Sequence, residues 1–499
     1  MNMLSSPQDI SNKKGGLMRW RILAPKLVVA MLAVFVGACA ASRTRTIVIA
    51  PVAPIGEADT PEVVDILPVR QFSLAEIIAP AQAVDVTAAP SCDIAKVVAE
   101  TFTDPGLASV SLNVGTKKHP YVEVRLGKVQ VFDDYEKDIA LRVLDPVSCT
   151  TEVIIVRKTY GTRTVSIPVK TKTGTSMKEQ VKPAALVSAP VGWSVEVVRR
   201  NDNGIEWNNW GTSFHVAAPE GRIVVGLKYP MVGASVKKGA ARVTSVVYVP
   251  HSEELMAVPA LIERGMTYIK EQEQRVKDDL RARGVRSAAF PDMLVADAME
   301  RYPTAYPLQQ LLPIEHMDMG EFIANQAWTT KRVYMVIGAN GSRFATYTCS
   351  PAAACGPQQF MPASYRDMRR RFPDAGLIKD VDEGRRDAFN SMKAAALLLD
   401  TQLKTLIEMR GPAIVHDSNV GELQAAGYNT GASRSGRVYG IALVKKLVEW
   451  TEARGKRCSK ANKWAECLLT ETKGYIAKYR YLTKEWPQEW TVALDARTP

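Results

Sequence analysis

The sequence predicts an α+β protein of several domains, in which an antiparallel β-rich domain, a sandwich or a barrel, precedes an α-helical domain. Ten short runs rich in β-branched and aromatic residues begin at residues 109, 121, 128, 139, 151, 164, 193, 213, 222 and 243. Gly, Pro, Asn or Asp separate many of them, as expected of antiparallel strands. Long charged patterns of helical character begin at Pro259 and continue to the carboxyl end.

The composition indicates that most of the chain folds. The 499 residues provide for about three domains. Hydrophobic residues make up 46% and charged residues 23%, which argues against wholesale disorder and against a polytopic membrane protein. The formal net charge of +12 favours anionic partners without choosing among them. We expect no nucleic-acid partner, because no known binding module is recognisable.

Residues 1–42 are typical of an export segment. Basic residues precede an apolar run from Leu27 to Ala38, which is too short to span a bilayer comfortably. Val36 to Cys39 resembles the processing box of bacterial lipoproteins, which implies a lipid on Cys39. An ordinary signal peptide and an uncleaved anchor are the alternatives. All three predict an exported protein of the periplasm or cell envelope, and a lipid on Cys39 would attach it to a membrane.

The pattern divides the remaining chain into three parts. Residues 43–90 are rich in Ala, Pro and Val with weak periodicity, as expected of a linker. The β-rich domain takes residues 91–250 and the helical domain residues 251–499. The helical pattern from Pro259 to Arg283 stops at Gly284, a typical helix end.

Six cysteines other than Cys39 are an even number in a chain predicted to be exported, which favours disulfides. Six cysteines allow 15 connectivities. Spacing favours two local pairs and leaves a third, longer one: Cys349 with Cys355, Cys458 with Cys467, and Cys92 with Cys149. We expect no metal site, because there is no CxxC and the five histidines are scattered.

Four segments between residues 300 and 482 carry residue types suited to sugar chemistry. The first is an apolar helical segment that ends at Glu315, and the second runs from Ser350 through Gly356 and Gln359 to Met361 and Pro362. The third contains Tyr428 and Asn429 followed by a glycine. The fourth contains Glu471 and Tyr475.

In this order, the four segments together resemble the soluble lytic transglycosylases, a lysozyme-like superfamily, and this chain would be a divergent branch. The resemblance implies a lysozyme-like α-helical fold with its motif core at 300–482. It implies cleavage of the β-1,4 bond between N-acetylmuramic acid and N-acetylglucosamine in peptidoglycan glycan strands, with a 1,6-anhydro end on the muramic acid. It implies a single glutamate as acid and base, here Glu315, and no cofactor.

The chemistry agrees with that role for Glu315. Protonation of a glycosidic oxygen needs an acid near neutral pH, and a carboxyl group serves when burial raises its pKa. The preceding Leu311, Leu312 and Ile314 predict a helix packed into the fold. A surface glutamate paired with Lys or Arg is the commoner fate, but the downstream segments favour catalysis. Asp318 is the nearest second carboxylate, and we expect it to cap a helix or pair locally.

The resemblance assigns roles to the other positions. It implies contacts with the glycan from Ser350, Gly356, Gln359, Phe360, Met361, Tyr428, Asn429 and Tyr475, and supporting roles for Glu471 and His316. The structural alternatives are a helix that starts at Pro362 and a turn that precedes a helix at residues 428–429. Three positions depart from the family pattern: His316 where Ser is usual, Ala353 where Gly is usual, and Leu469 where Pro is usual.

Two other functions stay open at this point. One is hydrolysis of the same bond by water, and the other is a non-catalytic cell-wall-binding or assembly protein. We further expect the β-rich domain to offer a surface to a protein partner of the envelope machinery.

Overall fold

A computed structural model describes residues 92–125, 128–171, 174–198, 213–232, 243–350, 353–430 and 470–495. These residues belong to one compact unit, Val84–Pro499. The predicted export segment 1–42 with Cys39 and the linker 43–90 lie outside the described residues. Within the described part of the chain the structure combines an antiparallel sheet region with many helices, so the α+β prediction is confirmed at that level.

Two short helices precede the strands. Helix α3 (Ile94–Glu100) begins after Asp93, whose side chain accepts from the amide of Lys96, and α4 (Pro105–Ser109) begins after Asp104, which caps Leu107. Asp followed by Pro is a strong helix start, because the carboxylate binds a free amide and Pro fits the first turn. The strand predicted over 109–114 is therefore wrong for all but its last residue.

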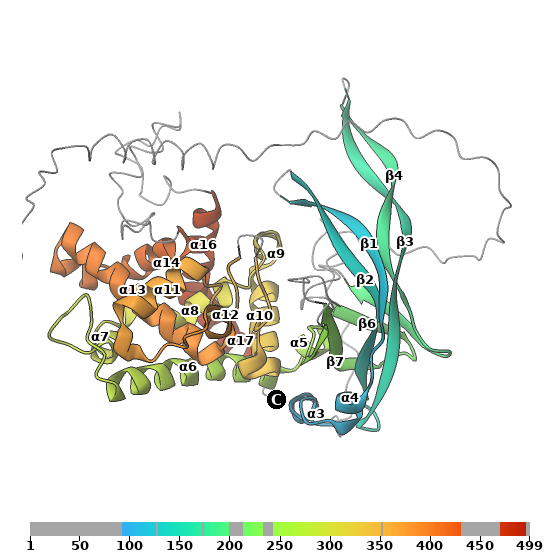
Figure 1. Ribbon diagram of the computed structural model, residues 1–499, viewed down its shortest axis with the longest axis horizontal. Coiled ribbons are helices and arrows are strands. Elements are labelled where there is room, and N and C mark those ends of the chain that lie inside the picture. Colours follow the sequence, from blue (N-terminus) through green and yellow to red (C-terminus); the bar gives the residue numbers. More distant parts are fainter. Residues whose placement is uncertain are drawn as a thin grey trace, which may run out of the picture. The chain divides into compact units, whose positions relative to one another are not determined.

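Six strands form the larger antiparallel sheet, in the order β4-β3-β2-β7-β8, with β1 also paired to β2. Their bounds are β1 (Val114–Arg125), β2 (Lys128–Asp145), β3 (Thr150–Thr171), β4 (Gly174–Ser188), β7 (Ile223–Val232) and β8 (Val243–Tyr248). Two pairs of predicted runs merge into the long strands β2 and β3, and β4 was not predicted. Figure 1 shows β3 and β4 as one long hairpin, paired from Arg157/Ser188 to Thr171/Gly174.

A second sheet has two strands, β5 (Ser194–Val198) and β6 (Ser213–Ala218). Val195, Phe214 and Val216 are buried. In β6 the buried Phe214 and Val216 alternate with exposed residues, the pattern of a strand with one face on a core.

The predicted pairing of Cys92 with Cys149 is confirmed. The bond ties the segment before α3 to the turn between β2 and β3. A buried arginine reinforces this connection, because Arg142 on β2 pairs with Asp104 and donates to the carbonyl oxygen of Val97.

The structure does not test the predicted pairing of Cys458 with Cys467. Both cysteines fall in the segment 431–469, which lies outside the described residues. The two disulfides within the described residues therefore include neither Cys458 nor Cys467. The bond between Cys458 and Cys467 stays a prediction from their spacing.

The remaining described residues from 253 onward are mainly helical. The α-helices are α5 (Glu253–Met256), α6 (Pro259–Ala282), α7 (Val295–Arg301), α8 (Leu308–Ile314), α9 (Met319–Ala324), α10 (Gln326–Asn340), α11 (Pro362–Arg371), α12 (Val381–Arg386), α13 (Ala388–Arg410), α14 (Val420–Thr430), α16 (Thr470–Arg480) and α17 (Trp486–Asp495). Short 3-10 turns lie at Pro303–Ala305, Gly341–Arg343, Pro373–Ala375 and Pro412–His416, and a π-helical turn at Tyr481–Glu485.

The predicted helix from Pro259 is confirmed, since α6 ends at Ala282 and Gly284 has a left-handed φ of 65°. Helices α6 and α10 approach very closely. A Cβ on Gly265 would lie 2.0 Å from the carbonyl oxygen of Tyr334, and one on Gly338 would lie 1.9 Å from that of Leu261. Both positions therefore require glycine.

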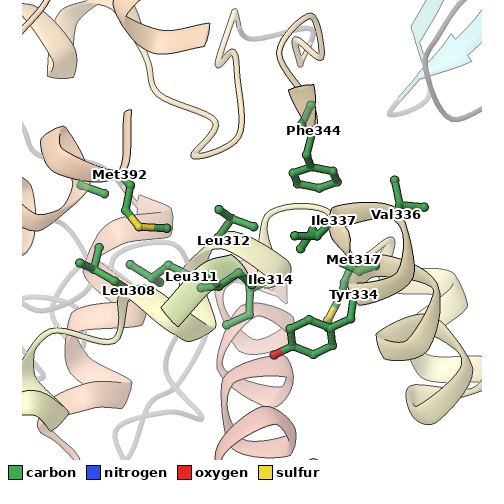
Figure 2. Packing of buried hydrophobic residues seen from close by; sticks show 14 of the residues in the cluster. Leu308, Leu311, Leu312, Ile314, Met317, Tyr334, Val336, Ile337, Phe344 and Met392 are labelled. Carbon is green, nitrogen blue, oxygen red and sulfur yellow. The ribbon is translucent and has the colours of Figure 1, made fainter. Parts of the chain in front are cut away.

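The hydrophobic core of this region surrounds α8. Figure 2 shows Leu308, Leu311, Leu312 and Ile314 among the buried side chains that they pack with, which include Met317, Tyr334, Ile337, Phe344 and Met392. This packing fixes the end of α8, where Glu315 follows. None of the helices in the described part of the chain combines the length and the apolar composition needed to cross a bilayer.

Candidate active site

Glu315 is the C-terminal cap residue of α8. Its amide donates to the carbonyl oxygen of Leu311 over 3.1 Å, which completes the last turn. The four preceding residues, 311–314, are buried, whereas Glu315 is only partly buried. The apolar helix therefore anchors the backbone of the residue that carries the carboxyl group, which agrees with the helix predicted to pack into the fold.

Helix α16 supplies the direct partner of this carboxyl group. The hydroxyl of Tyr475 donates to Oε1 of Glu315 over 2.8 Å. Tyr475 is 5% exposed, so its phenol is fixed by packing. Of the described residues, only Tyr475 bonds to the Glu315 side chain, which leaves most of the carboxyl lone pairs unused.

Burial raises the pKa of Glu315 from 4.5 to about 7. The hydrogen bond from Tyr475 and the positive charge of Lys478 act to lower this pKa, and the negative charge of Glu471 acts to raise it. Desolvation outweighs the stabilising partners because it penalises the ionised form directly. A carboxyl group with a pKa of about 7 can both donate and accept a proton at neutral pH.

Residues 353–360 form a tight loop before α11. The amide of Gln359 donates to the carbonyl oxygen of Gly356 over 3.0 Å, and Gly356 has a φ of 80°. A Cβ at Gly356 would lie 1.8 Å from the carbonyl oxygen of Arg385, so close backbone approach requires glycine here. Pro362 is the first residue of α11, as the sequence predicts.

A disulfide and a buried arginine hold this loop. Cys349 and Cys355 are bonded, which confirms the predicted pair. Nη1 of Arg385 donates to the carbonyl oxygens of Ala353 over 2.7 Å and Phe360 over 2.9 Å, at the two ends of the loop. Ala353 has a φ of 66°, a backbone conformation that favours glycine.

Several predicted glycan contacts serve the loop itself. Nε2 of Gln359 donates to the carbonyl oxygens of Gly356 over 2.7 Å and Thr348 over 3.3 Å, and the hydroxyl of Ser350 accepts from the amide of Ala354 over 3.1 Å. Phe360 is buried, whereas Met361 is 40% exposed. In the described part of the chain no hydrogen bond joins Gln359 to Glu315, so the structure places Gln359 as a loop-forming residue.

Tyr428 and Asn429 lie in the last turn of α14, so the alternative of a turn preceding a helix is wrong. The hydroxyl of Tyr428 donates to the carbonyl oxygen of Gln358 over 2.8 Å, and its ring contacts Phe360 edge-on. Burial and, less strongly, the charge of Glu315 raise the pKa of Tyr428 far above 10, which places this phenol within electrostatic range of the carboxyl group.

Asn429 faces α16 rather than Glu315. Its Oδ1 accepts from the hydroxyl of Thr472 over 2.9 Å, and its Nδ2 donates to Oε1 of Glu471 over 3.4 Å. Glu471 thus contacts Asn429, and its supporting role stays a prediction. These contacts join the ends of α14 and α16.

His316 links the Glu315 turn to the loop. Its Nε2 lies 2.7 Å from the carbonyl oxygen of Pro357, and its ring contacts Phe344 edge-on. A carbonyl oxygen only accepts, so Nε2 carries the proton. His316 therefore joins the residue after Glu315 to the loop by a hydrogen bond.

Asp318 is the capping residue of α9, as expected. Its Oδ1 accepts from the amides of Gly320 over 2.8 Å and Glu321 over 3.0 Å. This local role leaves Glu315 as the partly buried carboxyl group with unused acceptor capacity at the site.

Sequence reasoning missed three residues. Lys478 is buried, interacts electrostatically with Glu315 and lies three positions after Tyr475, a spacing that puts both on one helix face. Arg385 donates hydrogen bonds to both ends of the loop. Gln358 is fully buried and, among the described residues, neither Nε2 nor Oε1 of its side chain has a hydrogen-bond partner. Only the helical spacing of Lys478 was visible in the sequence.

The site thus joins one acid of pKa near 7, two phenols, a buried ammonium group and a braced loop. Such a set can transfer a proton to and from an oxygen atom. Comparisons of this chain with protein-family models, with curated proteins and with solved structures found no match.

Proposed function

We propose that this protein is a peptidoglycan lytic transglycosylase with Glu315 as its single acid and base. The observation that carries the proposal is the Glu315 carboxyl group, which burial brings to a pKa of about 7 and which Tyr475 orients with one hydrogen bond. The order of the four sequence segments gives the substrate class. The lysozyme-like fold of residues 300–482 and the sandwich or barrel form of the β-rich region belong to the same proposal.

The proposed reaction has two proton transfers at Glu315. The carboxylic acid first gives its proton to the bridging oxygen, so that the bond to C1 of N-acetylmuramic acid breaks and the N-acetylglucosamine hydroxyl leaves. The positive charge at C1 is shared with the acetamido group of the same sugar, a substrate-assisted route. The Glu315 carboxylate then takes the proton of the C6 hydroxyl, whose oxygen bonds to C1 and closes the 1,6-anhydro ring.

Two features favour this route over hydrolysis. The usual glycosidase pair needs a second carboxylate as nucleophile or base. Asp318 is engaged in capping α9, and Glu471 is bonded to Asn429. Hydrolysis by water is the second candidate, because Glu471 lies near enough to influence the Glu315 carboxyl group electrostatically.

The proposal includes export to the periplasm or cell envelope and a lipid on Cys39 that attaches the protein to a membrane. The disulfides Cys92–Cys149 and Cys349–Cys355 support it, because such bonds persist mainly in oxidising compartments. The proposed partners are glycan strands and, for the β-rich region, a protein of the envelope machinery.

Mass spectrometry of digested peptidoglycan tests the proposal. We expect the full-length protein to release fragments with 1,6-anhydro ends, one water lighter than reducing ends. Glu315→Gln should release these fragments at least about 10²-fold more slowly. Glu408→Gln, at an exposed glutamate, should behave as wild type. Reducing ends would instead establish hydrolysis. Glycan binding without products from any form would establish a non-catalytic role.

A further inference from the structure

One face of α16 is directed at the end of α8. Glu471, Tyr475 and Lys478 are spaced by four and three residues, so they lie on the same side of the helix. Gly474 permits the close approach, since a Cβ there would lie 2.5 Å from Sδ of Met319, just past the Glu315 turn. The helix thus brings a carboxylate, a phenol and an ammonium group toward one turn.

Lys478 contacts that turn directly. Its side chain is 8% exposed, and Nζ donates to the carbonyl oxygen of Met317, two residues after Glu315. An ammonium group loses hydration when buried, so a buried lysine is retained where other groups compensate for the loss. One compensating group here is the carbonyl oxygen of Met317, in the turn that follows Glu315.

The charged and titratable surroundings can be named for both groups. Around Glu315 they are Tyr475, Lys478 and Glu471 on α16 and Tyr428 on α14. Around Lys478 they are Glu315, Asp318 and Glu471, whose charges favour the ammonium form, and Arg332 on α10, whose charge opposes it. Desolvation is the largest influence and lowers the pKa of Lys478 from 10.5.

We propose that Lys478 is a positioning residue that holds the Glu315 turn through Met317 and sets the protonation of Glu315 by its charge. This inference deepens the proposed function and rests on it for its catalytic meaning. A positive charge stabilises the ionised carboxylate. Lys478 therefore counters the desolvation of Glu315 and keeps its two protonation states balanced near neutral pH.

Replacement of Lys478 separates the charge from the hydrogen bond. Lys478→Gln keeps a donor for the Met317 carbonyl group but removes the charge, so the titration midpoint of Glu315 should rise by about half a pH unit or more. Lys478→Arg restores the charge and should return the midpoint toward wild type. Lys473→Gln is the matched control, because Lys473 is exposed on the same helix.

Infrared difference titration reads this midpoint without any need for activity. The full-length protein is titrated from pH 5 to about 10, and the spectrum of Glu315→Gln is subtracted, so that the carbonyl band of the protonated Glu315 carboxyl group is followed. Each Lys478 variant is compared with the same variant carrying Glu315→Gln. Circular dichroism confirms that each protein is folded, and Lys478→Arg provides the folded comparison if Lys478→Gln does not fold.

The expected result is a raised midpoint in Lys478→Gln and an unchanged midpoint in both Lys478→Arg and Lys473→Gln. An unmoved midpoint in Lys478→Gln, or a shift of equal size in Lys478→Arg, would overturn the inference. Absence of anhydro products from the wild-type protein would instead overturn the proposed function and leave the infrared result to decide the electrostatic role of Lys478.

Discussion

Two carboxyl groups in the helical region are both desolvated, and they differ in their partners. Asp400 on α13 is fully buried and accepts from the hydroxyl of Ser287 over 2.6 Å, the amide of Ala288 over 2.6 Å and the hydroxyl of Tyr306 over 2.7 Å. Glu315 is partly exposed and accepts a single bond from Tyr475. Burial raises the pKa of both groups.

The difference separates a structural carboxyl group from a reactive one. The bonds from Ser287 and Ala288 fasten the segment before α7 to α13, and the bond from Tyr306 fastens the segment between α7 and α8 to it. Together they use the acceptor capacity of Asp400. Glu315 retains unused lone pairs on its carboxyl group, which a proton donor and acceptor needs. A raised pKa alone does not mark a catalytic residue, because it occurs at both sites.

The largest expected effect is on cleavage. Glu315→Gln should lower the rate of anhydro-product release by about 10² to 10⁴ fold, because the amide cannot donate the proton that the leaving oxygen needs. Asp400→Asn should keep the wild-type rate per folded molecule. Rates are measured on soluble glycan fragments and normalised to the folded fraction. Equal losses in both variants would break the distinction between the two carboxyl groups.

The second effect is on stability. The pKa of Glu315 is higher in the folded protein than the 4.5 of the unfolded chain, so its contribution is present at low pH and is lost as pH rises through about 7. The free energy of unfolding of Glu315→Gln lacks this loss. The difference in unfolding free energy between Glu315→Gln and wild type should therefore shift in favour of the variant by roughly 3 kcal/mol from acidic pH to a pH above about 7.

The matched change at the other carboxyl group should act in the opposite direction. Asp400→Asn should cost about 1 to 3 kcal/mol, because an amide nitrogen would meet groups that donate to it. Denaturant titrations at pH 4.5 and 8.5 measure both differences. A Glu315→Gln variant that is no more stable at the higher pH would show that the carboxyl group is not desolvated.

The smallest effects come from the tyrosines that donate to the two carboxyl groups, Tyr475 at Glu315 and Tyr306 at Asp400. Tyr475→Phe removes the donor that favours the ionised Glu315, so the pKa should rise and the alkaline limb of kcat/KM should move up by as much as about one pH unit. Tyr306→Phe should leave that limb in place and lower the free energy of unfolding by about 1 kcal/mol. A shifted limb in Tyr306→Phe would contradict the separation of the two sites.

Helix ends and short-range disulfides depend on residues close together in the chain, and the sequence predicted several of them. Gly284 marked the end of α6, Pro362 marked the start of α11, and spacing indicated the bond between Cys349 and Cys355. Charged and polar residues interrupt the apolar alternation of residues 174–188, and this strand forms through its ladder with β3. Its tertiary pairing overrides a weak local preference.

The sequence indicated several residues of the candidate site, but it did not indicate which atoms these residues contact. The segments identified Glu315 and Tyr475, but no local pattern could indicate the hydrogen bond that joins them across a sequence separation of 160. The glycan contact of Gln359 stays a prediction, and the sequence did not indicate that its amide nitrogen bonds to the carbonyl oxygens of Gly356 and Thr348. Such choices depend on which backbone groups lie within reach after folding, so no local pattern encodes them.

Cleavage in water enriched in oxygen-18 tests the central claim most directly, that one carboxyl group completes the reaction with an oxygen of the substrate itself. The account predicts that the new muramic acid ends carry no label and are one water lighter than reducing ends. Oxygen-18 at C1 of the new ends would show that water attacks the sugar, and it would contradict the proposed role of Glu315 as the base for the C6 hydroxyl.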